Sequence, residues 1–268
     1  MRDFAFARPT SLADAASAFA GGGEAAFIAG GHTLLPAIKS RLRMPDTLID
    51  LAAIPGLSGV TRDSDRLWVG AMTTHAAVVA DAGAIPALVA MAAMIGDNQV
   101  RNRGTLGGVI ANNDPAADYP AALLALDAVV ETDRGRHASD DYFQGMFATA
   151  LADGEIVTRV GFRVPVAAAY AKFRNPASRY AIVGVFVARH ANGVRVAVTG
   201  AGPGVFRWTD AESALTANFR VDAVAGITLD AGDLNTDIHA SAEFRAHLAG
   251  VMLAKAVGDC DDGGTLGR

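Results

Sequence analysis

Two glycine-rich segments most constrain what this chain of 268 residues can fold into. The first reads Ala29-Gly30-Gly31-His32-Thr33, and the second reads Gly104-Thr105-Leu106-Gly107-Gly108. Each stands at the edge of an expected strand or helix, and glycine permits positive φ and removes the Cβ that would hold a ligand away. Successive backbone N–H groups in such turns bind phosphate oxygens without a lysine. One glycine pair alone is most simply a turn, whereas two pairs, each beside a threonine, favour a ligand-binding role without naming the ligand.

The amino-acid composition excludes several classes of protein. Hydrophobic residues make up 51% of the chain, which is enough for a sizeable core. The net charge of -5 argues against a nucleic-acid partner or an anionic membrane surface, because both need clustered Lys and Arg. Cys260 is the single cysteine, so this chain alone cannot form a disulfide framework, a multi-cysteine zinc site or an iron–sulfur cluster.

No segment is expected to cross a membrane. The longest uncharged stretch, residues 82–96, contains Pro86 and is shorter than the ~20 apolar residues of a spanning helix. The N-terminus meets acidic residues at once and has no apolar run of the kind found in signal peptides. We therefore expect a cytoplasmic protein.

Residues 1–165 predict a two-part α/β module. In residues 1–54, strands at 4–6, 25–29 and 47–51 alternate with a helix capped by Ser11 and a helix over 34–42. In residues 55–165, a strand at 66–71 precedes a helix capped by Thr73 or Thr74 and a helix over 85–95. Residues 96–108 are too rich in glycine and polar side chains for regular structure. Pro115 is placed to begin a helix that reaches about residue 126, and a strand follows at 128–132.

The rest of the chain predicts a C-terminal domain over residues 166–258. Strands are expected at 170–173, 180–189 and 194–199, and Asn192-Gly193 is a strong hairpin signal between the last two. Residues 210–257 are expected to be helical, and residues 259–268 to form a disordered tail. The fold class is therefore α+β.

Other well-known site motifs are missing from the sequence. There is no G-x-x-x-x-G-K-[ST], and no G-x-G-x-x-G followed by a distant acid, which excludes P-loop and Rossmann sites. Residues 56–59 lack the spacing of a nucleophile elbow. The six histidines (positions 32, 75, 137, 190, 239 and 247) show no metal-ligand spacing. Each is interpreted as a surface or satisfied core residue, except His32 because of its glycine neighbours, and no metal site is predicted.

Several stretches together resemble the FAD-binding medium subunit of molybdenum hydroxylases, the family that includes carbon monoxide dehydrogenase and the flavin domain of xanthine dehydrogenase. The first motif is residues 29–36, followed by Leu48-Ile49-Asp50-Leu51. The second, and the more specific, is residues 95–108 and their continuation through 112–118. Residues 170–174 and 246–251 are similar to the family's C-terminal domain, so the resemblance covers nearly the whole chain.

The resemblance implies a vanillyl-alcohol-oxidase-type (PCMH-type) FAD-binding module of two α/β subdomains, residues 1–54 and 55–165. A C-terminal domain with an antiparallel sheet and helices would close on it. FAD would lie non-covalently between the subdomains, with its diphosphate on the backbones of residues 29–33 and 105–108. Carried over position by position, the implied cofactor-binding residues are Ala29, Gly30, Gly31, His32, Thr33, Leu34, Ile95, Thr105, Gly107, Gly108, Val109, Asp118, Val157 and Lys172.

Four of these residues have implied roles outside the glycine segments. Ile95 would pack on the flavin or the ribityl chain, and Val157 would make apolar contacts. Asp118 would accept hydrogen bonds from sugar or ribityl hydroxyls. Lys172 would approach the isoalloxazine, where an ammonium stabilises the negative charge of the reduced ring. The residues by themselves leave two alternatives open, namely that Lys172 is an exposed strand lysine and that Asp118 belongs to a capped helix turn.

The sequence departs from the family pattern at one position. The second motif often has asparagine after the glycine pair, and here that position is Val109, so any side-chain hydrogen bond made there is lost. His32 is similar to the histidine that carries a covalent flavin in other proteins of the wider fold. The medium subunits hold FAD non-covalently, and the same is expected here.

The resemblance also implies partners. In the family, a large subunit carries the molybdenum cofactor, a small subunit carries two 2Fe-2S clusters, and the medium subunit passes electrons through FAD to an external acceptor. This chain is thus expected to be an oxidoreductase subunit of a heterotrimer or a dimer of heterotrimers, with no catalytic acid–base side chain. Two alternatives stay open: a stand-alone FAD-dependent oxidase or reductase of the same fold, and an assembly or chaperone-like protein that has lost FAD, which the intact glycine motifs disfavour.

Overall fold

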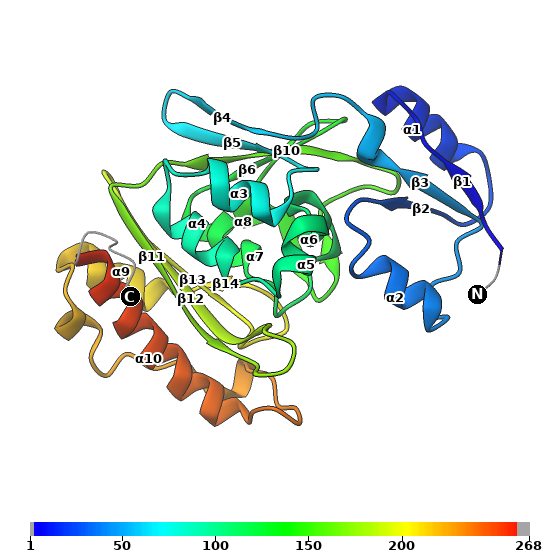
Figure 1. The fold of residues 1–268 in the computed structure, drawn as a ribbon. Helices are drawn as coiled ribbons and strands as arrows, with labels where there is room; N and C mark the ends of the chain where they lie inside the picture. Colours follow the sequence, from blue (N-terminus) through cyan, green and yellow to red (C-terminus); the bar gives the residue numbers. More distant parts are fainter. Residues whose placement is uncertain (1–2, 262–268) are drawn as a thin grey trace.

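The computed structural model describes residues 3–261 as three main sheets with helices between and around them (Figure 1). The N-terminal sheet has the order β1–β3–β2, with strands Ala5–Ala7, Thr47–Asp50 and Ala25–Ile28 that pair in parallel. Helix α1 (Leu12–Ala20) begins as predicted, because Ser11 Oγ accepts a hydrogen bond from the Asp14 N–H. Helix α2 (Leu34–Lys39) ends before the predicted residue 42, and Arg41 takes a left-handed φ of 60°.

The second sheet is antiparallel and has the order β4–β5–β10–β6–β7. Its strands are Val60–Asp63, Arg66–Gly70, Val157–Arg163, Val129–Thr132 and Arg136–Ala138. The central strand β10 follows a long excursion through helix α8 (Ser139–Tyr142) and the small hairpin of β8 (Phe143–Gly145) and β9 (Ala148–Thr149). The sequence analysis did not predict β10.

A layer of helices covers one face of this sheet: α3 (His75–Asp81), α4 (Pro86–Ala93), α5 (Asn98–Arg103), α6 (Leu106–Asn112) and α7 (Tyr119–Ala125) (Figure 1). The prediction that residues 96–108 have no regular structure was wrong. Asp97 and Thr105 act as N-caps, since their side chains accept hydrogen bonds from the N–H groups of Val100 and Gly108. Two short helices therefore form in spite of the glycines, because each has a capping side chain at its start.

The third sheet packs on the other side of these helices. It is antiparallel, with β11 (Ala167–Arg174), β12 (Ala181–His190), β13 (Gly193–Thr199) and β14 (Phe206–Arg207), and the predicted hairpin joins β12 to β13. Helix α9 (Thr209–Ala217) packs against β13, and α10 (Ala242–Asp261) packs against β11 and β12 on the face away from α4 and α7 (Figure 1).

Two C-terminal predictions need correction. Residues 210–257 are not continuously helical, because only short 3-10 turns (Val221–Val224 and Ala231–Asp233) lie between α9 and α10. The disordered tail predicted from residue 259 is wrong for residues 259–261, which continue α10, and the remainder of that tail lies outside the described residues. Within residues 3–261, none of the helices combines the length and the apolarity needed to span a bilayer.

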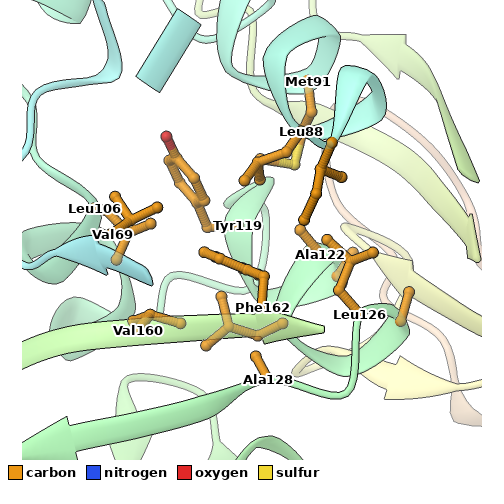
Figure 2. Close-up of a cluster of buried hydrophobic side chains, with 14 of the residues drawn as sticks. Val69, Leu88, Met91, Leu106, Tyr119, Ala122, Leu126, Ala128, Val160 and Phe162 are labelled. Atoms are coloured by element: carbon orange, nitrogen blue, oxygen red, sulfur yellow. The ribbon is translucent and has the colours of Figure 1, made fainter. Parts of the chain in front are cut away.

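The main hydrophobic core lies between the second and third sheets. Figure 2 shows its centre, where Tyr119 from α7 and Leu126, the residue that follows α7, meet Phe162 from β10. The same cluster includes Tyr170 and Phe186 from the third sheet. The boundary predicted at residue 165 therefore separates two sheets but not two cores. A second cluster fills the space between the third sheet and helices α9 and α10.

Residues 115–118 join the helical layer to the third sheet. Pro115 O accepts hydrogen bonds from the Gly200 N–H (2.9 Å) and from Thr199 Oγ1 (3.0 Å), and the same hydroxyl also reaches Ala117 O at 2.7 Å. These carbonyls are occupied by the sheet, so the helix begins at Tyr119 and not at Pro115 as predicted.

Arg195 on β13 holds the same two layers together further along the sheet. Its Nε donates to Leu124 O at 2.8 Å, and its other nitrogens pair with Asp127 (2.9 Å) and Asp140 (2.5 Å). Arg195→Lys keeps the charge but cannot make three hydrogen bonds in this fork-shaped arrangement. We expect the free energy of unfolding to fall by about 1–3 kcal/mol in urea titrations. Arg62→Lys, at an exposed strand position, is the control, and equal losses in both variants would contradict this role of Arg195.

Candidate functional site

A cavity of about 720 Å³ lies beside the N-terminal sheet and helices α5 and α6, and it extends to the loop between β11 and β12. A volume of this size falls within the range of small-molecule and cofactor sites. All the residues predicted from the resemblance line this cavity, except Lys172. The structure thus brings together two glycine segments that are far apart in the sequence.

The first glycine segment, residues 29–33, connects β2 to α2 and presents a row of free donors. Among the hydrogen bonds of residues 3–261, none is donated by the backbone N–H groups of residues 30–34. Gly31 has a φ of +75°, a conformation that favours glycine and allows the chain to turn into α2. His32 and Thr33 are exposed at the rim of the cavity. Several unpaired N–H groups in one concave turn fit an anionic group such as a diphosphate.

The second glycine segment, residues 104–108, is not equivalent to the first. The N–H groups of Leu106 and Gly107 are bonded to Thr73 O and Ala71 O, and that of Gly108 is bonded to Thr105 Oγ1. The sequence prediction of a second nest of free N–H groups is therefore wrong for these three positions. Gly107 instead provides space, because a Cβ there would lie 2.6 Å from Ala71 Cβ.

The two segments touch through their backbones. A Cβ at Gly30 would lie 2.8 Å from the Cα of Gly104 and closer still to the carbonyl oxygen of Arg103. Gly108 lies on the same wall, and a Cβ there would be 3.6 Å from Ala29 Cβ. Backbone atoms cannot move aside as a flexible side chain can, so glycine at position 30 is required for this contact.

Asp118, at the start of α7, is the buried acidic group of the cavity wall. Its side chain is 6% exposed, and it accepts hydrogen bonds from Tyr170 OH (2.5 Å) and Lys172 Nζ (2.9 Å), both on β11. Burial raises the pKa of Asp118, whereas the Lys172 ammonium and the Tyr170 hydroxyl act in the opposite direction. Burial and then the charge of Asp118 raise the pKa of Tyr170 far above its ordinary value, so this hydroxyl keeps its proton and donates.

The structure settles the two alternatives left open for this pair. Asp118 makes no side-chain cap for α7. Lys172 is not an exposed strand lysine, because its side chain is 1% exposed and bound to Asp118. Lys172 is not among the residues that line the cavity, and its ammonium is bound to Asp118, which does line it. Tyr170 was not predicted as a site residue, although it stands in the stretch 170–174 that resembles the family and lies two residues before Lys172 on the same face of a strand.

Ile95, Val109 and Val157 form apolar parts of the wall. Val157 is buried on β10 and belongs to the main core, while Ile95 and Val109 are half-buried and pack against that core. Among the described residues, no group of three or more His, Cys, Asp or Glu side chains is placed to hold a metal ion.

Thr149 and residues 151–157 also line the cavity, and the sequence analysis missed them apart from Val157. Glu155 fixes this loop, since its carboxylate accepts from Thr132 Oγ1 at 2.6 Å and from the Ala152 N–H at 2.8 Å. These hydrogen bonds lower the pKa of Glu155 against the effect of burial. No sequence motif predicts that this loop lines the cavity, because its position depends on pairing between strands that are far apart in the sequence.

His75, the first residue of α3, is a second lining residue that the sequence analysis passed over. Its side chain packs against Gly104 and against the ring of Tyr119, whose centroid is 5.3 Å away. Burial, followed by the nearby charges of His32 and Arg101, lowers the pKa of His75 from 6.5 to about 4. The imidazole is therefore neutral at neutral pH.

Because its pKa is lowered in the folded protein, His75 makes the stability of the fold decrease at acidic pH. Between pH 6.5 and about 4, the unfolded chain binds a proton at His75 that the folded chain does not, so stability falls as the pH is lowered through this window. The free energy of unfolding should lose roughly 3 kcal/mol from this residue between pH 7 and pH 4. Urea titrations at both pH values should show a smaller loss for His75→Gln, and equal losses in the two proteins would contradict the assignment.

The cavity, with its row of free N–H groups, is that of a protein that binds a small anionic ligand, and comparison with known proteins identifies the class. Residues 2–167 match the family described as FAD binding domain in molybdopterin dehydrogenase. The chain is 35% identical to the nicotine 6-hydroxylase medium subunit of Paenarthrobacter nicotinovorans, over 94% of this chain and 95% of that subunit. It is 31% identical to the carbon monoxide dehydrogenase medium chain of Hydrogenophaga pseudoflava, over 95% and 96% of the two chains.

Comparison with solved structures gives the same class of protein. A chain of Cu,Mo-CO dehydrogenase superposes with a TM-score of 0.87 at 32% identity, covering 97% of this chain and 98% of that one. A chain of quinoline 2-oxidoreductase from Pseudomonas putida 86 gives a TM-score of 0.87 at 26% identity, covering 99% of both chains. This protein belongs to the family of FAD-binding domains of molybdopterin dehydrogenases. The resemblance and the fold class predicted from the sequence are confirmed.

The residues present fit FAD. The free N–H row of residues 30–34 suits a diphosphate, and the close glycine contact keeps side chains out of the groove between the two segments. The apolar and acidic groups further along the wall suit a long ligand with hydroxyl groups and an aromatic ring.

Proposed function

We propose that this chain is the FAD-binding medium subunit of a heteromeric molybdenum-containing hydroxylase or dehydrogenase, and that it relays electrons from a partner's 2Fe-2S clusters through FAD to an external acceptor. The observation that carries the proposal is the single cavity wall formed by both glycine segments and Asp118, in a chain that matches medium subunits over almost their whole length. One cysteine is too few for an iron–sulfur cluster, so the clusters must belong to a partner.

The fourteen predicted residues would hold the cofactor in different ways. FAD, when bound, supplies a carrier that accepts and releases electrons one or two at a time. The N–H groups of residues 30–34 would bind the diphosphate, and Ile95 and Val157 would cover apolar parts of the ligand. Asp118 would orient ribityl or sugar hydroxyls. Lys172 would act through Asp118, by holding the carboxylate in place with Tyr170, and not by touching the ring as the resemblance implied.

The proposed partners follow from what this chain lacks, since one cysteine cannot hold an iron–sulfur cluster. A small subunit would carry the 2Fe-2S clusters, and a large subunit would carry the molybdenum cofactor and select the organic substrate. The assembly would be a heterotrimer, or a dimer of heterotrimers, in the cytoplasm. The relatives support this proposal, because their names describe medium subunits of a nicotine hydroxylase and a carbon monoxide dehydrogenase.

An absorbance spectrum of the purified full chain, before and after acid precipitation, tests the cofactor. Flavin bands at about 370 and 450 nm that stay in the supernatant are expected for non-covalent FAD. A yellow pellet would instead place a covalent flavin, most simply on His32, and favour a stand-alone oxidase. A colourless protein that takes up no added FAD, alone or with its co-purified subunits, would overturn the proposal.

The partner proposal has a separate test. An affinity-tagged chain isolated from its own cells should bring down two further subunits, with iron and molybdenum measurable in the eluate. A flavin-containing chain that elutes alone with full oxidase or reductase activity would overturn the relay function while leaving the FAD site intact.

A further inference from the structure

The second glycine segment is short of hydrogen-bond donors for an anion, and His75 lies directly beside it. Leu106, Gly107 and Gly108 have their N–H groups bonded within the protein. Of residues 105–108, only the Thr105 N–H has no partner among residues 3–261, so a diphosphate that meets both segments would find fewer free backbone donors here than at residues 30–34. A side-chain donor beside this segment would add to them.

The absence of a side chain at Gly104 leaves room beside one nitrogen of the His75 ring. A Cβ at position 104 would lie 2.6 Å from His75 Nε2. Gly104 has an ordinary φ of -59°, a conformation that any residue adopts, so glycine is needed here for space and not for backbone shape. His75 lines the cavity although its residue surface is only 1% exposed.

The other ring nitrogen determines the tautomer. His75 Nδ1 is buried and has no hydrogen-bond partner among residues 3–261. An unpaired buried N–H costs more than an unpaired lone pair, so the proton of the neutral ring belongs on Nε2. A neutral imidazole with its N–H beside Gly104 is a donor that needs no charge, in a part of the cavity where His32 and Arg101 already oppose protonation of the ring.

We propose that His75 is a cofactor-positioning residue, whose Nε2–H donates a hydrogen bond to the diphosphate of the bound dinucleotide opposite the N–H groups of residues 30–34. This inference rests on the proposed FAD function. It adds one side-chain donor at the start of α3 to the backbone donors in the turn between β2 and α2. Tyr119, which packs against His75 from the core, does not line the cavity, and Figure 2 shows its hydroxyl pointing away from Phe162.

FAD titration of the full chain, prepared with whatever subunits co-purify with it and stripped of flavin, tests the proposal. His75→Phe should weaken FAD binding by about 10- to 100-fold, the usual effect of losing a hydrogen bond to a charged group. His75→Gln, which can still donate, should recover most of this loss. Tyr119→Phe is the matched control, because it removes a neighbouring buried hydroxyl outside the cavity, and it should bind FAD as the parent does. The ³¹P resonances of the bound diphosphate should move in His75→Phe and not in Tyr119→Phe.

Several results would overturn the inference. They are unchanged FAD affinity in His75→Phe, equal losses in His75→Gln and His75→Phe, or unmoved ³¹P resonances. If His75→Phe does not fold, ¹⁵N-histidine labelling of the parent protein decides, with the His75 signal assigned by its loss in His75→Gln. The Nε2 resonance must then shift when FAD is added, and no shift would overturn the proposal. A parent protein that binds no FAD at all would instead overturn the proposed function.

Discussion

Gly30→Ala is expected to abolish FAD binding. The new methyl group would meet the carbonyl oxygen of Arg103 and lie 2.8 Å from the Cα of Gly104. Both obstacles are backbone atoms, so the two glycine segments would have to separate, and the N–H groups of residues 30–34 would move with them. Overpacking of this kind also costs about 1–3 kcal/mol of stability. Flavin absorbance of the purified variant, followed by titration with FAD, measures the loss, which should exceed 100-fold in affinity.

Gly83→Ala is the control for this variant. Gly83 is exposed, and a Cβ there meets nothing within 4 Å. It should purify with as much FAD as the parent protein. If Gly30→Ala also keeps its flavin, the contact between the two segments is not what shapes the cofactor site.

Lys172→Met is expected to have the largest effect on stability. It removes the ammonium from a buried ion pair and leaves the Asp118 carboxylate, 6% exposed, with Tyr170 as its remaining side-chain partner. Breaking a buried pair on one side costs about 3–5 kcal/mol, because the other charge stays buried. Chemical denaturation at neutral pH measures this as a fall in the free energy of unfolding. The variant should also regain stability when the pH is lowered, as Asp118 takes up a proton.

A double variant separates charge burial from lost packing. Lys172→Met combined with Asp118→Asn has no buried charge at this place and should recover most of the lost stability. Lys255→Met removes a mostly exposed ion pair with Asp259 on α10 and should change stability by less than about 1 kcal/mol. If the double variant is as unstable as Lys172→Met alone, the ion pair is not the reason for the effect.

Much of the fold was predictable where local signals are strong. Ser11 predicted the start of α1, and the prediction of Thr73 or Thr74 at the start of α3 is met by Thr74, since Ser11 and Thr74 each cap their helix through a side-chain oxygen. The Asn192-Gly193 signal located the β12–β13 hairpin to within a residue. Failures arose where distant parts of the chain decide the local structure. Pro115 does not begin a helix because the carbonyls around it are bonded to the third sheet, which no nearby residue indicates.

In the candidate site, too, some features could be predicted from the sequence and others depend on distant residues. The residues implied by the resemblance line the cavity, Lys172 excepted, but their backbone hydrogen bonding could not be predicted from the glycines themselves. The N–H groups of Leu106 and Gly107 are bonded to the carbonyl oxygens of Thr73 and Ala71. Both of these residues lie more than thirty residues before Gly107 in the sequence. His75 was dismissed because histidine alone carries little information, and its meaning comes from the glycine that leaves room beside Nε2.

The hydrophobic cluster that runs through both sides of residue 165 limits how such subunits can exchange parts. A recombination event or a designed chimera that joins a foreign C-terminal half after residue 165 would separate Tyr170 and Phe186 from their packing partners on α7 and β10, and Lys172 from Asp118. A graft that preserves the site must therefore bring its own α7 together with its own third sheet. The unit that must stay together is thus the sandwich of helices and two sheets, although the family match ends near residue 167.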